Sequence, residues 1–170
     1  MTQQQISVMR EHPIETLALP AGWHETMSGT GDRPGSIERI FKNANFPSAK
    51  IFLYQSGFPA SSAVLDRLHS LLSERAQILT RTKIENVIEV MGNMGRPTVF
   101  RPLMIRTEAI SGKNVLSVEG SWSDNEEAYA LFMPTNGRIL ELHYQAPRAD
   151  FRKNLAAIKA SFSTIVWQST

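Results

Sequence analysis

Residues Glu126–Trp167 read EEAYALFMPTNGRILELHYQAPRADFRKNLAAIKASFSTIVW. The runs Glu127–Met133 and Arg138–Gln145 have the length and composition of β-strands. They flank Asn136-Gly137, a pair that tolerates the positive φ angles of tight hairpin turns. After Pro147, apolar residues recur at helical spacing. This stretch therefore predicts a β-hairpin followed by an amphipathic helix.

The second arm of the predicted hairpin has two distinct faces. Leu140, Leu142 and Tyr144 point one way, and Glu141 and His143 point the other, because side chains alternate along a strand. A sheet must bury its apolar face, so we expect the last helix to cover the leucine face. Any function that uses this hairpin is then expected on the face of Glu141 and His143.

The remaining chain predicts one domain over residues 13–170, after a flexible N-terminus at residues 1–12. A helix is predicted over Ala60–Leu79, with Ser61 or Ser62 as its N-cap. For Thr82–Gly95 a short helix is favoured over a strand. The stretch Ser28–Gly35 is expected to be an ordinary loop rather than a phosphate cradle. Strands are predicted over Ile14–Leu19, Ser36–Asn43, Lys50–Ser56, Thr98–Ile110 and Val115–Trp122.

Composition excludes several classes of function. The 170 residues include no cysteine, so a thiolate nucleophile, a disulfide framework and cysteine metal sites are ruled out. The 18 basic and 16 acidic side chains are too balanced to predict nucleic-acid binding. No apolar run has the length of a membrane span. The first residues lack the pattern of a signal peptide, so we expect a cytoplasmic protein.

Four residues are candidates for binding. Glu141 and His143 share a strand face, where a carboxylate could orient an imidazole base, although two polar residues on a solvated or partly covered face are the favoured interpretation. Trp167 ends the last helix, and Arg101 lies on the long strand that contains Pro102. Proline interrupts a ladder, so a bulge or a sheet edge is expected there. No catalytic residue, metal ligand or cofactor is predicted.

The order of elements resembles the PsbP/Mog/DcrB superfamily. The residues that carry the resemblance are the opening turn Leu19-Pro20-Ala21-Gly22-Trp23 and the final hairpin and helix with Phe151, Phe162 and Ile165. The resemblance implies an α+β fold, an α/β/α sandwich with a twisted, mainly antiparallel sheet flanked by helices. It also implies a protein without enzymatic activity. Superfamily members include a photosystem II subunit, a Ran-binding import factor, an envelope lipoprotein and chaperones of type VI secretion effectors.

The function expected first is a non-enzymatic protein-binding module of a bacterial cytoplasmic kind, such as a secretion-associated chaperone, an adaptor or an immunity-type protein. A protein partner is therefore expected, and such chaperones are often homodimers. The alternative is a small-molecule or lipid-binding domain with a cavity between sheet and helix, in which methionines such as Met91 and Met94 supply a soft lining. An enzyme that uses Glu141 and His143 is the third hypothesis. It requires both side chains to line a concave pocket.

Overall fold

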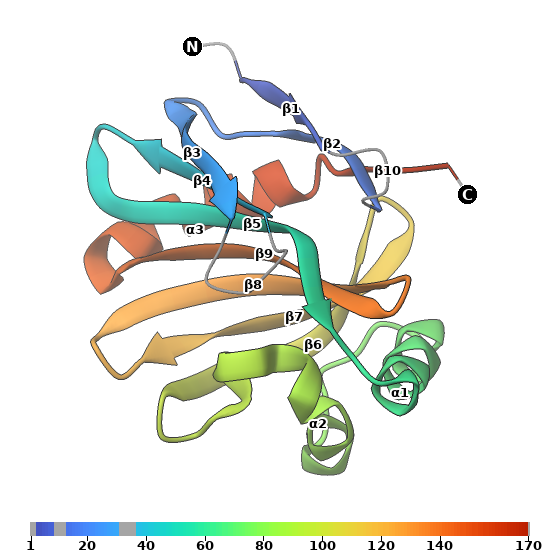
Figure 1. The fold of residues 1–170 in the computed structure, drawn as a ribbon. Helices are drawn as coiled ribbons and strands as arrows, with labels where there is room; N and C mark the ends of the chain where they lie inside the picture. The colour runs from blue at the N-terminus through green and yellow to red at the C-terminus, as the bar shows by residue number, and fades with distance from the viewer. Residues whose placement is uncertain (1–2, 9–12, 31–36, 170) are drawn as a thin grey trace.

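A seven-stranded antiparallel sheet forms the centre of the molecule (Figure 1), in the order β3-β4-β5-β9-β8-β7-β6. The computed structural model describes residues 3–8, 13–30 and 37–169. A second sheet has the order β1-β2-β10. The strands are β1 (Gln5–Ser7), β2 (Ile14–Ala18), β3 (Trp23–Thr30), β4 (Ile37–Asn43), β5 (Phe46–Pro59), β6 (Phe100–Ile110), β7 (Lys113–Trp122), β8 (Glu126–Thr135), β9 (Arg138–Pro147) and β10 (Val166–Trp167). The helices are α1 (Ser62–Ser73), α2 (Arg81–Val87), the 3-10 segment η1 (Ile88–Gly95) and α3 (Arg148–Phe162).

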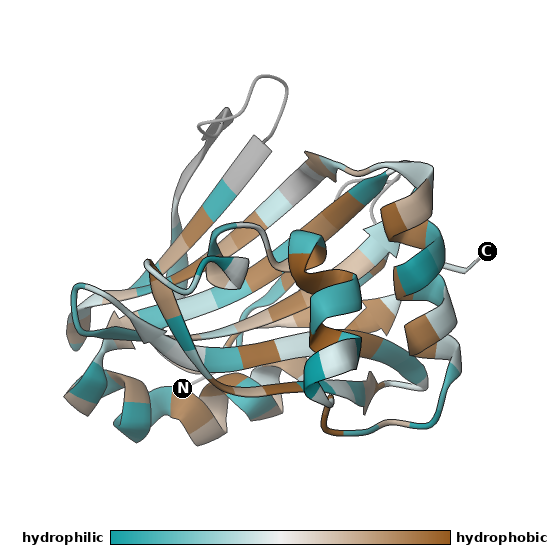
Figure 2. Ribbon diagram, turned by 90° about the horizontal axis from the view of Figure 1, so that it is seen from below, coloured by the Kyte–Doolittle hydropathy of each residue, from teal (hydrophilic) through white to brown (hydrophobic). Residues whose placement is uncertain are grey.

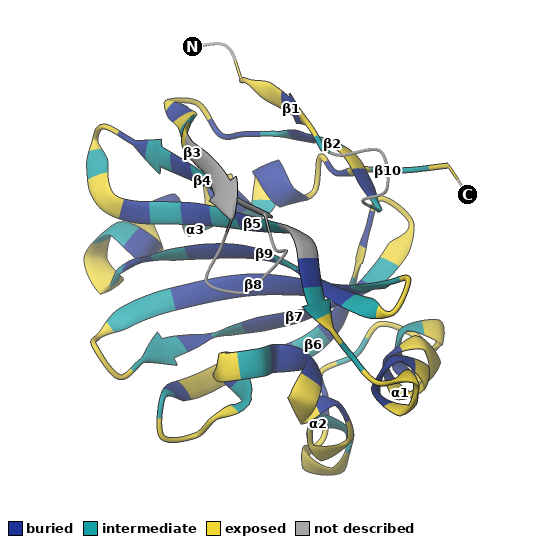
Figure 3. Ribbon diagram, viewed as in Figure 1, coloured by how far each residue is buried: buried dark blue, intermediate teal, exposed yellow. Residues whose placement is uncertain are grey.

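Helix α3 covers one face of the large sheet, as the hairpin pattern predicted. The leucine face of β9 packs under it, and the ring of Tyr144 stacks on Phe151 with centroids 5.2 Å apart. The other side of α3 contacts β2, so the helix lies between the two sheets. Figure 3 shows buried residues in dark blue along the central strands, and those that face α3 belong to this core. Its fully buried residues include Leu17, Leu19, Phe41, Leu142, Ile158 and Phe162.

Helix α1 and segment η1 pack on the opposite face and form a second core with β6, β7 and β8. Figure 2 looks onto this side and shows the helical segments over one part of the sheet, with bare strands beside them. The bare part belongs to β4, β5 and β9, where Phe52, Tyr54 and Gln145 are only partly buried. The sheet therefore carries helices on both faces, as expected, but one face is only half covered.

Two expectations near the N-terminus were wrong in part. Strand β3 runs as far as Thr30, although a loop was expected from Ser28. Within residues 1–12, expected to be flexible, Gln5–Ser7 forms β1 and pairs with β2. Residues 31–35 of the expected loop, and residues 1–2 and 9–12, lie outside the described part of the chain.

The predicted helix over Ala60–Leu79 ends earlier, at Ser73. Beyond it the chain runs beside the edge of β6, where Leu79 N donates to Ile105 O and Thr107 N donates to Gln77 O. Backbone pairing with β6 thus replaces further helix. The predicted cap is confirmed, because the hydroxyl of Ser61 accepts a hydrogen bond from Val64 N.

The break predicted at Pro102 is confirmed, because the register between β6 and β7 shifts between Pro102 and Met104. The extra residue also changes which way the arginines point. Arg101 lies opposite Ser121 and Arg106 opposite Ser117, so both arginines project from the α3 side of the sheet. A regular strand would have placed them on opposite faces.

Candidate functional site

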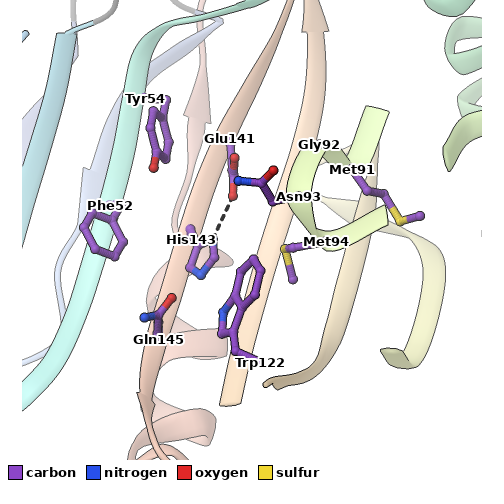
Figure 4. A pocket seen from close by; sticks show the side chains of 10 residues that line it. All are labelled: Phe52, Tyr54, Met91, Gly92, Asn93, Met94, Trp122, Glu141, His143 and Gln145. Atoms are coloured by element: carbon purple, nitrogen blue, oxygen red, sulfur yellow. Dashed lines mark hydrogen bonds and ion pairs between the residues drawn. The ribbon is translucent and has the colours of Figure 1, made fainter. Parts of the chain in front are cut away.

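A cleft of about 260 Å³ opens where the helical cover of the sheet stops (Figure 4). Segment η1 forms one side, and β5 and β9 form the other. The cleft is lined by Phe52, Tyr54, Met91, Gly92, Asn93, Met94, Trp122, Glu141, His143 and Gln145. Two of the four candidate binding residues, Glu141 and His143, therefore share a concave site.

Glu141 and His143 form a hydrogen-bonded pair on this face of β9. Nδ1 of His143 lies 2.7 Å from Oε1 of Glu141. An ionised carboxylate only accepts, so Nδ1 carries a proton, and Nε2 is an acceptor in the neutral form of the ring. The residue His143 is only 5% exposed. Its Nε2 is buried and has no hydrogen-bond partner among the described residues. Of the two faces expected for this pair, solvated or partly covered, the structure has the partly covered one.

Trp122 reaches His143 across strand β8. Its indole lies parallel to the imidazole, with ring centroids 6.0 Å apart and an interplanar angle of 9°. The intervening positions carry small residues, Gly120, Ala128 and Ala130, which leave room for the large ring. The ring of Phe100 packs against the indole from the other side in an edge-to-face arrangement, with ring centroids 4.9 Å apart. Nε1 of Trp122 is also buried without a partner in the described part of the chain.

Strand β5 supplies the aromatic wall opposite Trp122. Phe52 is the cross-strand neighbour of His143, and Tyr54 is that of Glu141. The ring of Phe52 meets the imidazole edge to face, at 5.8 Å and 88°. The sequence pattern did not reveal these two residues as part of a site, because pairing of β5 with β9 joins segments about ninety residues apart. Their alternation along β5 was the one available signal.

Segment η1 closes the cleft through an unusual backbone turn. Gly92 has φ 54° and ψ −126°, a conformation that residues with a Cβ atom rarely adopt. On either side of the turn, Met91 and Met94 are buried against the second core and also line the cleft. Asn93 lies between them, and Figure 4 shows its side chain directed toward Glu141. The helix expected over Thr82–Gly95 is confirmed, with this break in it.

The third candidate, Trp167, lies in a different and wider depression of about 720 Å³. That depression lies between α1, the turns after β6 and β8, and the C-terminal segment. Trp167 is partly buried, and its Nε1 donates to Ile110 O at 2.8 Å. The ammonium of Lys113 lies 5.6 Å from the centroid of its ring. These contacts attach the C-terminal segment to the β6–β7 turn.

The fourth candidate, Arg101, lines a third depression beside α3, together with Glu127, Arg148 and Arg152. Arg148 forms an ion pair with Glu127 at 3.2 Å. Arg101 is exposed and projects from the face opposite the cleft. The structure thus brings together Glu141 and His143, and separates both from Trp167 and from Arg101.

The described residues 3–8, 13–30 and 37–169 contain no cluster of three histidine or acidic side chains that could hold a metal ion. Over the same residues, no helix has both the length and the apolar character needed to cross a bilayer.

These features define a mixed α+β domain whose antiparallel sheet carries helices on both faces and a polar–aromatic cleft on one of them. The fold is PsbP-like: the chain is similar to the solution structure of cyanobacterial PsbP (CyanoP) from Synechocystis sp. PCC 6803, with a TM-score of 0.59 and 11% sequence identity. The match covers 98% of this chain and 93% of that one. No protein-family model and no curated protein sequence matches the chain. At this identity the likeness establishes the fold alone, and it confirms the PsbP part of the resemblance.

Proposed function

We propose that this protein is a non-enzymatic binding module that holds a side chain of a partner protein in the cleft around His143. The observation that carries the proposal is the pair of ring nitrogens, Nε2 of His143 and Nε1 of Trp122, which are buried at one cleft without a partner among the described residues. An unsatisfied buried polar group costs about 1–3 kcal/mol, so two together are typical of a site kept for binding. A cleft of about 260 Å³ has the size for one large side chain or a small molecule.

The same geometry argues against catalysis. A carboxylate that orients a histidine is half of a general-base system, and the third hypothesis required both residues to line a pocket. They do so, but Nε2 is buried in this arrangement of the cleft and is not placed to activate a water molecule there. No serine or threonine is among the described residues that line the cleft. Both observations support binding over chemistry.

The kind of partner follows from the resemblance. The proposed protein is a cytoplasmic secretion-associated chaperone, an adaptor or an immunity-type protein. Its proposed assembled form is a homodimer. The proposed domain spans residues 13–170. A small molecule is the second candidate occupant, favoured by the limited volume and the methionine lining of the cleft. A long lipid chain suits the cleft less well, because Asn93, Glu141 and Gln145 line it.

The test is affinity capture from extracts of the host cell with three proteins. They are the unmodified chain, the cleft variant Glu141→Leu/His143→Phe, and the control Glu85→Gln on the exposed surface of α2. We expect a stoichiometric protein that the unmodified chain and the control retain and that the cleft variant loses. Retention by the cleft variant would place the contact elsewhere. Absence of any stoichiometric protein would favour the small-molecule alternative.

A further inference from the structure

The formal charge of the cleft comes from one residue. Among the described side chains that line it, Glu141 is the one acidic residue, and none of the others is a lysine or an arginine. Only 16% of the Glu141 side chain is exposed. Its Oε1 is bonded to His143, and its Oε2 forms no hydrogen bond with the described residues. A carboxylate in this position favours a positively charged group beside it.

The walls of the cleft suit a cation as well. Phe52, Tyr54 and Trp122 surround the Glu141–His143 pair on two sides (Figure 4). The electron-rich faces of such rings attract ammonium and guanidinium groups, most strongly where water is excluded. The thioethers of Met91 and Met94 add polarizable atoms without a competing positive charge.

The hydrogen-bonding groups match the same occupant. Oε2 of Glu141 and Nε2 of His143 are both acceptors, and both lack partners among the described residues. A guanidinium offers five N–H donors and an ammonium three, with no acceptor to oppose the carboxylate. Nε2 is shielded from solvent, so an occupant that bonds to it must displace one of the side chains around the imidazole, among them Trp122 and Phe52. Trp122 is itself partly exposed, at the rim of the cleft.

We propose that the cleft recognises a positively charged side chain, arginine or lysine, which enters between Trp122 and Phe52 and pairs with Glu141. The inference rests on the proposed function only in naming a partner protein as the source of the cation. The positive charge of the occupant is argued from the cleft itself. Two lysines near the cleft would instead favour a negatively charged occupant, so the test includes a negatively charged probe. Lys50 is the cross-strand neighbour of Gln145, and Lys42 is that of Lys50, on the same face of the sheet.

The experiment titrates the intact protein with four small probes and follows the indole N–H signals by NMR. The signal of Trp122 is assigned with Trp122→Phe. The probes are the N-acetyl amides of arginine, lysine, citrulline and glutamate. Citrulline has nearly the shape of arginine but no charge. We expect arginine or lysine to shift the Trp122 signal and to bind about tenfold more tightly than citrulline, the gain of a charge-assisted contact.

The substitution Glu141→Gln removes the charge but keeps an oxygen that accepts from His143. It should abolish the preference for arginine over citrulline, whereas Glu85→Gln, the same change on α2, should leave it intact. Equal binding of citrulline, tighter binding of glutamate, or no shift of the Trp122 signal with either cation would overturn the inference.

The two proposals can fail separately. If the cleft variant loses a protein partner while arginine and citrulline bind alike, the proposed function stands and the inference about charge is wrong. If the cations bind but no protein partner depends on the cleft, the charge inference stands and the source is a small amine or guanidine.

Discussion

The indole of Trp122 lies parallel to the imidazole of His143, although strand β8 separates the two strands that carry them. The stack exists because the residues between them, on β7 and β8, are glycine and alanine. Nε2 of His143 is buried beside this stack and has no hydrogen-bond partner among the described residues. On the proposed function, the arrangement exchanges stability for a binding surface, and this exchange can be tested by changes to either member of the Glu141–His143 pair.

Replacing Glu141 and His143 together should stabilise the fold. Glu141→Leu/His143→Phe removes a largely buried polar pair and one unsatisfied nitrogen, so we expect a gain of about 1–3 kcal/mol in the free energy of unfolding. His143→Phe alone should instead cost about 1–3 kcal/mol, because the carboxylate then lacks its partner. Urea unfolding measures both. A double variant less stable than the single one would show that the pair stabilises the fold.

The glycine at position 120 is required by the bulge in β6. A Cβ atom there would lie 2.2 Å from Arg101 O and 2.8 Å from Cζ of Phe100. Gly120→Ala should therefore lower the free energy of unfolding by about 1–3 kcal/mol, because backbone cannot move aside as a side chain can. The neighbouring change Ser121→Ala is the control and should have little effect. Equal unfolding midpoints for both variants would contradict this account.

Arg39 makes stability depend on pH through Glu25. Its guanidinium donates to both oxygens of Glu25, at 2.8 and 2.6 Å, and these hydrogen bonds and its charge outweigh partial burial and lower the pKa of Glu25 from its usual 4.5. The folded state thus binds this proton less readily than the unfolded state. The pair stabilises the protein fully above pH 4.5 and loses its effect as pH falls through the lower, folded pKa.

Glu25→Gln should therefore flatten the loss of stability below pH 4.5 and lower stability at neutral pH. Urea midpoints across acidic pH provide the measurement. Arg39→Gln should return the pKa of Glu25 toward its usual value in an NMR titration. A pKa that does not rise in that variant would exclude Arg39 as the cause.

Asn114 caps the end of helix α1 from the β6–β7 turn. Its Nδ2 donates to Leu72 O and to Glu74 O, both at 2.9 Å. Terminal carbonyls of a helix lack partners within the helix, so we expect Asn114→Ala to cost about 1 kcal/mol. Asn114→Asp should cost more, because a carboxylate cannot donate and its charge is unfavourable beside the negative end of the helix. Thermal unfolding ranks the variants. An aspartate as stable as asparagine would contradict the cap.

Much of the fold followed from local signals. The Asn136-Gly137 turn, the alternation in β9 and the stripe of α3 lie within one short stretch, and the structure has all three. Strand β3 was missed because it carries few apolar residues and, as an edge strand, pairs only with β4. Helix α1 was predicted too long because its apolar pattern continues to Leu79, while the backbone turns to pair with β6.

The site could be predicted only in part. That Glu141 and His143 face away from α3 follows from strand alternation alone. The partners that turn them into a cleft come from β5, β7 and η1, and no local pattern specifies which strand lies beside β9. Pro102 predicted a bulge, but which face Arg101 would take depended on a single extra residue. Pairing between distant segments is set by the whole core, so residues such as Phe52 were not recognisable in advance.

The position of α3 between the two sheets has a consequence for synthesis on the ribosome. Leu17 and Leu19 are synthesised long before α3, the helix that covers them. Ser161, whose hydroxyl donates to Ala18 O at 2.6 Å, is separated from it by 143 positions. Contacts between such distant segments form slowly, and unpaired strand edges promote aggregation. The nascent chain must therefore leave the apolar face of β2 uncovered until α3 has been made, and during that time the segment is a target for protection by chaperones.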